Sequence, residues 1–220
     1  LNDKSISDKV LSYLQTEQLE QSAIKDFFKA LRFCYKGKFE YFAKEYLEKS
    51  KYFKAIILDD RDGFQTFSFL LICCYKCGLS KEASKLISLL TNAELNQLLK
   101  SSPVNITTLS TRLFKNYNPN FCKRIVETLS EPDWAKKFMQ PPPFIASNSL
   151  TEFKEINRTA ARNIFLEMDE TELGINLSRL KYFYFEKAIS EFKEIDPDKA
   201  KRLFEFYSDE RMLVALNKCK

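Results

Sequence analysis

The densest group of reactive side chains in the sequence is a cysteine cluster, Cys73, Cys74 and Cys77. A zinc site needs four ligands, usually two Cys-x-x-Cys pairs or cysteines combined with histidines, and the sequence has neither a second pair nor a histidine. A catalytic thiolate needs a neighbouring base or a helix N-terminus, whereas this cluster follows an apolar helical pattern. We therefore predict no metal and no cofactor, and we interpret the cysteines as reduced thiols of a cytoplasmic protein.

Two runs of acidic residues could place carboxylates close together, as glycoside hydrolysis requires. Both runs lie between apolar helical segments, where Asp and Glu cap helices and favour their N-termini. We predict no catalytic residue, and a carboxylate-based hydrolase is the second alternative function. The acidic residues in question are Asp59, Asp60, Asp62, Glu167, Asp169, Glu170 and Glu172.

The sequence lacks the residues that most other enzyme classes use. It contains no histidine, which excludes histidine triads, dyads and proton relays within the chain. Its glycines are too far apart to form a dinucleotide-binding fingerprint or a P-loop. We therefore expect a protein that is not an enzyme. The four glycines are Gly37, Gly63, Gly78 and Gly174.

An aromatic residue followed by lysine recurs three times at similar intervals. If the segments that carry these pairs stack, the pairs form a basic edge with interleaved aromatic rings, suited to an acidic peptide, a nucleic-acid backbone or an anionic surface. The competing interpretation is an aromatic core residue followed by a lysine that the helix C-terminus favours. The candidate binding residues are Tyr35, Lys36, Tyr75, Lys76, Phe114 and Lys115.

The sequence is also rich in aromatic side chains, with 20 Phe and 10 Tyr. Some of them must remain at the surface, where exposed aromatic patches mark protein interfaces. Residues 182–185 are four successive aromatics, which cannot all face one core from a helix. We add Phe144 and Tyr182 to the candidate binding residues.

Apolar residues recur three and four positions apart along nearly the whole chain, which predicts an all-α protein. Gly78 is expected to end one helix in a left-handed conformation. Asn118 and Asp196, each followed by proline, are expected to cap two others. Ser149 and Glu152 have the spacing of a capping box.

The sequence also contains a weak internal repeat. Residues 33–36 align with residues 73–76 at an offset of 40, and residues 70–90 align with residues 109–129 at an offset of 39. The pattern of each repeat predicts a helix, a short turn and a second helix. Helix pairs at such a period are typical of stacked repeats, so we predict an α-solenoid-like architecture.

One of these segments distantly resembles an ankyrin-type repeat, in residues 60–66, 70–78 and 86–90. The Thr-Pro-Leu-His motif of that family is missing, the first helix is longer, and the period is nearer 40 than 33. Tetratricopeptide and HEAT-like repeats match nearly as well. Each of these resemblances implies a binding scaffold without chemistry of its own.

Three consecutive prolines, Pro141 to Pro143, favour extended geometry and predict a linker at 141–148. Residues 1–140, with 22 basic and 16 acidic side chains, are expected to form a helical-repeat domain. Residues 149–220, after the linker, are expected to form an irregular helical C-terminal subdomain. No apolar run approaches the roughly 18 residues of a membrane span.

These observations together favour a non-catalytic scaffold for protein–protein interaction, with another protein of unknown identity as its partner. Because the sequence begins at Leu1, we expect it to be a domain of a larger polypeptide. Its composition is frequent among effector proteins of intracellular bacteria, which are delivered to a host cytosol. The first alternative function is nucleic-acid or anionic-surface binding through the basic helical edge.

Overall fold

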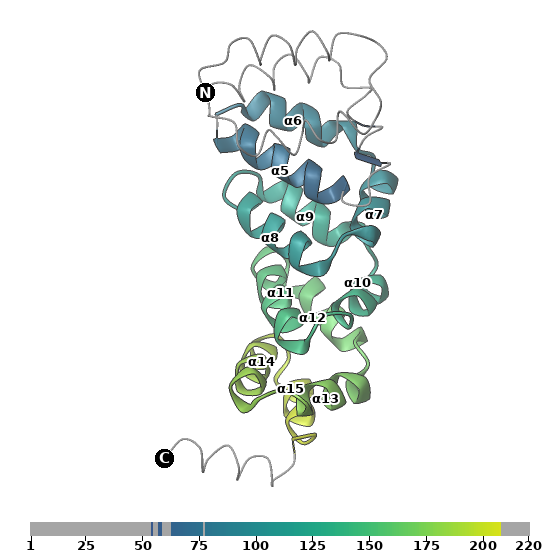
Figure 1. The fold of residues 1–220 in the computed structure, drawn as a ribbon, viewed down its shortest axis with the longest axis vertical. Helices are drawn as coiled ribbons and strands as arrows, with labels where there is room; N and C mark the ends of the chain where they lie inside the picture. Colours follow the sequence, from purple (N-terminus) through teal and green to yellow (C-terminus); the bar gives the residue numbers. More distant parts are fainter. Residues whose placement is uncertain (1–53, 55–56, 59–62, 77, 208–220) are drawn as a thin grey trace, which may run out of the picture. The chain divides into compact units, whose positions relative to one another are not determined.

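The computed structural model describes residues 54, 57–58, 63–76 and 78–207 (Figure 1). These residues form eleven α-helices and no strand, which confirms the all-α prediction for this part of the chain. The candidates Tyr35 and Lys36 lie outside the described residues. The helices are α5 (Gly63–Lys76), α6 (Ser80–Leu89), α7 (Asn92–Ser101), α8 (Val104–Phe114), α9 (Pro119–Thr128), α10 (Glu131–Phe138), α11 (Pro143–Ile156), α12 (Arg158–Glu167), α13 (Glu170–Ser178), α14 (Tyr182–Ile195) and α15 (Pro197–Phe204).

The chain divides into two compact parts, residues 1–90 and residues 91–220. In the first part α5 packs against α6, and Gly78 ends α5 with a φ of 77°. The amide of Gly78 donates to the carbonyl of Tyr75 and the amide of Leu79 donates to that of Cys74, which is the Schellman motif. The predicted left-handed stop at Gly78 is confirmed.

In the second part the helices follow one another at equal intervals. Helices α7, α10 and α13 begin at residues 92, 131 and 170, at a constant offset of 39. The same offset separates the starts of α8, α11 and α14 and those of α9, α12 and α15. We call residues 91–129, 130–168 and 169–207 the first, middle and last modules, and this offset the module length.

The residues that start these helices recur at the same interval. A side-chain oxygen accepts the backbone N–H three residues ahead in every case at the first and third helix of a module, which satisfies a donor that the helix leaves unpaired. The expected caps Asn118 and Asp196 are confirmed among them. The capping residues are Thr91, Ser130, Asp169, Asn118, Asn157 and Asp196.

Helices of neighbouring modules lie side by side in the second part (Figure 1). Helix α11 contacts both α8 and α14, and the third helix of each module contacts its first and second helices. Aromatic residues pack both within and between modules: the ring of Phe153 meets that of Trp134 edge-on at 4.9 Å inside the middle module, and Phe165 stacks on Phe192 of the last module at 4.6 Å. All four side chains are buried.

The structure places a helix where the sequence predicts a linker. Residues 143–148 form the first turns of α11, with Pro143 at a position where the missing N–H of proline costs no hydrogen bond. The buried contact of Trp134 with Phe153 joins the two sides of the expected boundary, and the chain divides into its two compact parts between residues 90 and 91 instead. Ser149 is buried within α11 and does not cap a helix, because α11 has already begun.

None of the described helices combines the length and the apolar character that crossing a membrane requires.

Candidate functional site

The aromatic–lysine pairs occupy the C-terminal ends of the helices that carry them. Tyr75 is half-buried and Lys76 is exposed at the end of α5. Phe114, by contrast, is completely buried, with its ring 5.7 Å from that of Phe121. The aromatic member of this pair is therefore part of the core, as the competing interpretation holds, and only its lysine reaches the surface.

Lys115 is held by α11, a helix of the following module. Its ammonium group bonds the Glu155 carboxylate and lies 3.5 Å from Glu152, which also accepts Arg112 Nε at 2.6 Å. The hydrogen bond with Glu155 raises the pKa of Lys115, and the same bond lowers the pKa of Glu155. One module further, Lys154 pairs with Glu194 at 2.6 Å. Carboxylates of the following module thus neutralise these cations.

The candidates Phe144 and Tyr182 lie in two different ring contacts. Phe144, on α11, meets Tyr184 of α14 at 4.9 Å, although the two residues are 40 positions apart. Tyr182 is half-buried, 6.3 Å from the ring of Tyr207. Phe183 lies 5.5 Å from Tyr184 and is 68% exposed. Phe144, Phe183 and Tyr184 therefore form a continuous patch, which we call the aromatic patch.

The described cysteines are ordinary core residues. Cys74 and Cys122 are buried free thiols, and Cys122 Sγ lies 3.4 Å from the carbonyl oxygen of Thr111. Burial raises the pKa of Cys122 to about 12, so its reactive thiolate is scarce at neutral pH. Within the described ranges, no three His, Cys, Asp or Glu side chains are grouped as metal ligands would be.

The described acidic run is built into helix ends. Asp169 caps α13 by accepting the amide of Glu172 at 2.7 Å. Both carboxylate oxygens of Glu170 accept hydrogen bonds from the guanidinium of Arg202, which lowers the pKa of the carboxylate. These contacts agree with the structural interpretation of the run. The aspartates at positions 59, 60 and 62 lie outside the described residues.

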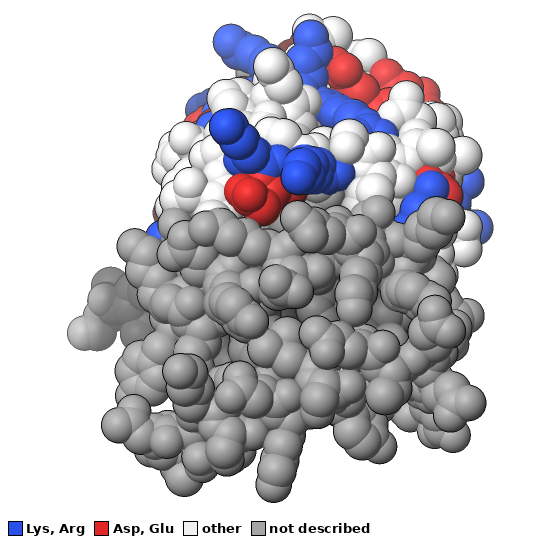
Figure 2. Space-filling model, turned by 90° about the horizontal axis from the view of Figure 1, so that it is seen from above, with Lys and Arg blue, Asp and Glu red and all other residues white. Residues whose placement is uncertain are grey.

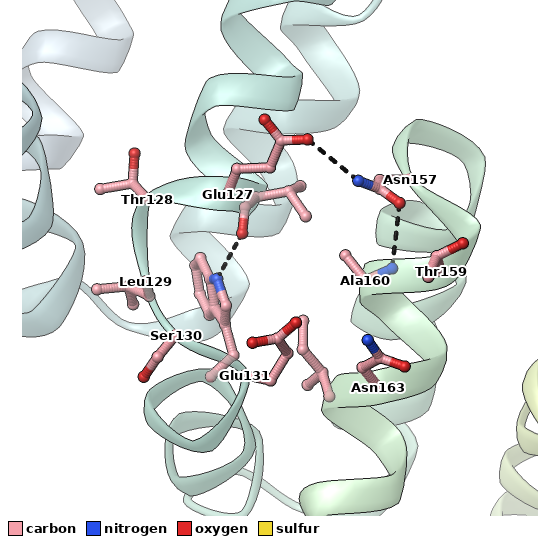
Figure 3. A pocket seen from close by; sticks show the side chains of 12 residues that line it. Glu127, Thr128, Leu129, Ser130, Glu131, Asn157, Thr159, Ala160 and Asn163 are labelled. Atoms are coloured by element: carbon pink, nitrogen blue, oxygen red, sulfur yellow. Dashed lines mark hydrogen bonds between the residues drawn. The ribbon is translucent and has the colours of Figure 1, made fainter.

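A cavity of about 330 Å³ lies where the first and middle modules adjoin, between the end of α9, the start of α10 and the first turns of α12 (Figure 3). Hydrogen bonds hold its walls. Trp134 Nε1 donates to the carbonyl of Val126 at 2.9 Å. Asn157 Nδ2 donates to Glu127 Oε1 at 3.2 Å, while Asn157 Oδ1 caps α12. The cavity is therefore bounded by side chains in definite positions.

Two polar side chains point into this cavity from opposite sides, Glu131 from α10 and Asn163 from α12 (Figure 3). Neither has a hydrogen-bond or ion-pair partner among the described residues. The Glu131 carboxylate only accepts hydrogen bonds, and the Asn163 amide can both accept and donate them. With Glu127 beside them, they make a site that favours positive charge and repels anions.

Sequence analysis did not identify this cavity. Its alignment of repeats ended at residue 129, although Phe153-Lys154-Glu155-Ile156 recurs one module length later as Phe192-Lys193-Glu194-Ile195. Extending the alignment through that motif would have aligned Asn163 with Arg124 and Arg202. The asparagine at a position where both other modules have an arginine is the signal that could have found the site.

Comparison with family models, with curated proteins and with solved structures finds no match to this chain.

Proposed function

We propose that the chain is a non-catalytic protein-recognition scaffold, an α-solenoid built from a recurring three-helix module. The observation that carries this proposal is the recurrence of helix starts and caps at one interval through three modules. A single module cannot bury its own apolar face, so such modules stack and share a continuous core. A module of 39 residues with three helices favours the HEAT-like resemblance over the ankyrin-like one.

The same interval extends beyond the three modules. Helix α6 begins at Ser80, and α9 begins one module length later, at Pro119. The C-terminal region after residue 148 is regular in this proposal, since α11 to α15 keep the spacing of α8 and α9. Lysine-to-glutamate pairs repeat the pattern on the surface, from Lys115 to Glu155 and from Lys154 to Glu194.

The aromatic patch supports a protein as the partner. Aromatic side chains are enriched in protein interfaces, where they bury a large area at a small entropic cost. Phe183 and Tyr184 are 68% and 41% exposed, and Phe144 packs beside them from the neighbouring module. A surface assembled from two modules is the kind of binding surface that stacked repeats present.

The charges favour a protein over a nucleic acid. Binding to a phosphate backbone releases counterions from phosphates that lysine and arginine neutralise, but Arg112, Lys115 and Lys154 already pair with carboxylates. In Figure 2 the described part of the visible face shows basic and acidic residues intermixed, with no continuous basic strip. The basic edge is therefore a weak candidate for an RNA or DNA site.

A peptide selection tests the proposal. The full chain is immobilised and used to select binders from a displayed library of random peptides at 150 mM salt. We expect selected peptides to lose about tenfold or more in affinity for a Phe183→Ser/Tyr184→Ser variant, because aromatic anchors carry much of the energy of an interface. Ile175→Ser, which removes a similarly exposed apolar side chain from α13, is the matched control.

Two outcomes contradict the proposal. One is a selection that yields no saturable peptide. The other is saturable binding of labelled RNA or duplex DNA that weakens steeply as salt rises, which is the property of a phosphate-binding surface.

A further inference from the structure

In two modules an arginine of the third helix forms a hydrogen bond with a residue of the first helix. In the first module Arg124 Nε donates to Asn92 Oδ1 at 2.9 Å. In the last module the Arg202 guanidinium donates hydrogen bonds of 2.9 and 3.0 Å to the Glu170 carboxylate. In each case the acceptor is the first residue of the first helix, and the arginine lies 32 positions later.

The middle module keeps the acceptor and lacks the arginine. Glu131 is the first residue of α10, one module length from both Asn92 and Glu170. The residue equivalent to Arg124 and Arg202 is Asn163, whose side chain is too short to replace an arginine. The Glu131 carboxylate is consequently left facing the cavity with no described partner.

A second cation is missing from the same place. In the last module the buried ammonium of Lys199 donates to the carbonyls of Phe165 at 2.7 Å and Leu166 at 3.1 Å. The residue one module length before Lys199 is Ala160, which lines the cavity. The residues equivalent to Phe165 and Leu166 are Val126 and Glu127, and these line the cavity too.

The cavity therefore lies at the position equivalent to the one that the side chains of Lys199 and Arg202 fill in the last module. We infer that it receives the guanidinium group of an arginine from a partner polypeptide, an inference that rests on the proposed function. The planar fork of arginine matches a carboxylate with two parallel hydrogen bonds, as Arg202 shows by donating from Nε to Glu170 Oε1 and from Nη2 to Glu170 Oε2, both at 2.9 Å. Glu131 supplies that carboxylate, and the amide oxygen of Asn163 can accept a further N–H.

The site selects its ligand by charge. Glu127 and Glu131 both line it, and the cation paired with Glu127, Lys123, is an exposed residue 3.8 Å away on the same helix. A phosphate or a carboxylate would be repelled, whereas an arginine gains a charge-assisted bond. The carboxylates of Glu127 and Glu131 and the amide oxygen of Asn163 are hydrogen-bond acceptors, which a guanidinium needs.

The single tryptophan of the sequence makes the test direct. Trp134 lines the cavity and its indole N–H bonds the carbonyl of Val126, so its one indole signal in a ¹H–¹⁵N NMR spectrum reports on this site. N-acetyl-arginine amide is titrated into the full chain. We expect a saturable shift of the indole signal, and at least about tenfold weaker binding of the uncharged N-acetyl-citrulline amide, because bonds to charged groups are stronger.

Three variants locate the binding. Glu131→Gln should weaken arginine-amide binding about tenfold or more, while Glu186→Gln, the same change at an exposed position of α14, should leave it unchanged. Asn163→Arg should abolish the shift, because the new side chain occupies the cavity as Arg202 does in the last module. A far-UV circular dichroism spectrum that matches the parent shows that each variant is folded.

The inference is overturned if the indole signal does not move, if citrulline amide binds as well as arginine amide, or if Mg²⁺ alone produces the shift. If arginine amide fails while selected peptides still depend on Phe183 and Tyr184, this inference falls and the scaffold proposal stands. If arginine amide binds and no displayed peptide does, the cavity is a cation site and the scaffold proposal falls.

Discussion

The middle and last modules have the same framework and different interiors. Ser130 and Asp169 cap their first helices, and Asn157 and Asp196 cap their third helices, at identical intervals. Yet the last module fills the space between those helices with Lys199 and Arg202, and the middle module leaves a cavity there. Caps and apolar residues therefore suffice to build the module.

The comparison separates side chains that form the fold from side chains that are free to change. A cap satisfies helix donors that would otherwise be unpaired, so its position tolerates few residue types. In the last module Lys199 satisfies buried carbonyls and Arg202 pairs with a half-buried carboxylate, and the middle module forms without these cations. Positions of this second kind are where modules of one array can acquire different binding properties.

The largest effect is expected at a buried core position that differs between the two modules. Trp134 in the middle module corresponds to Leu173 in the last, and both are buried. Trp134→Ala should lower the free energy of unfolding by about 3–5 kcal/mol, because it leaves a cavity beside Phe153. Trp134→Leu should cost clearly less. Urea unfolding followed by circular dichroism measures both, and a loss below about 1 kcal/mol for the alanine variant would show that the two helices do not share a core.

Removing the buried ammonium of the last module should have the next largest effect. Lys199→Met leaves the carbonyls of Phe165, Leu166 and Met168 without their donor, and we expect a loss of about 1–3 kcal/mol at pH 7. Lys201→Met, at an exposed position of the same helix, is the control. Equal stability of the two variants would contradict a structural role for the ammonium.

The same variant has a pH signature. Burial lowers the pKa of Lys199 below 10.5 in the folded state, so in the window between the two pKa values the unfolded chain binds more protons and stability rises with pH. The advantage of the parent over Lys199→Met should therefore grow as the pH rises toward 10.5. Lys137, whose pKa burial also lowers, is present in both proteins and cancels in the difference. A constant difference between pH 7 and 10 would be inconsistent with the buried charge.

A smaller effect is expected from making the cap of the last module resemble that of the middle one. The amide of Lys199 and the guanidinium of Arg162 both bond Asp196 and lower its pKa below 3.8. Asp196→Asn should cost about 1 kcal/mol at pH 7. Because a lowered carboxylate pKa stabilises the fold above its ordinary pKa and loses that stabilisation on acidification, the cost should vanish as the pH falls through and below 3.8.

Thermal unfolding between pH 2 and 7 measures that loss. Asp198→Asn removes an exposed carboxylate from the same helix and serves as the control. A cost for Asp196→Asn that persists unchanged at pH 2 would mean that charge is not its cause.

The smallest effect is expected from exchanging the residues that distinguish the two interiors. Arg202→Asn should lower the Tm slightly and Asn163→Arg should raise it slightly, since exposed ion pairs contribute little. Both changes should shrink in 1 M NaCl, where the Debye length is about 3 Å. Differential scanning calorimetry at low and high salt checks the pair. An Asn163→Arg variant with a lowered Tm would show that the cavity cannot hold an arginine.

Features set by a few neighbouring residues were predictable. Gly78 ends α5 because glycine adopts a positive φ without steric cost, and Asn118 caps α9 because its side chain reaches an amide three residues ahead. Pro141 to Pro143 misled the prediction of a linker, since the last of these prolines occupies the first position of a helix, where its missing N–H costs no hydrogen bond. The module length was visible in the sequence as the offset between its repeats, but not that each interval in the second part holds three helices.

The same distinction between local and tertiary features applies to the candidate binding residues. The competing interpretation had placed the aromatic residue of each pair in the core, and Phe114 is buried there. The pairing of Lys115 with Glu155 and the meeting of Phe144 with Tyr184 each join residues 40 positions apart, and no local pattern indicates which of many such pairs will touch.

From the sequence alone follow the helical class, the caps and the interval, because helix formation depends on contacts within three or four residues and on the spacing of apolar side chains. The tertiary structure alone decided that the lysines of one module are neutralised by the next, and that a carboxylate faces a cavity where an arginine is missing. Those properties depend on which surfaces of distant segments pack together. The sequence does not show which residues surround the position of a missing side chain, so only the structure shows that a cavity remains there.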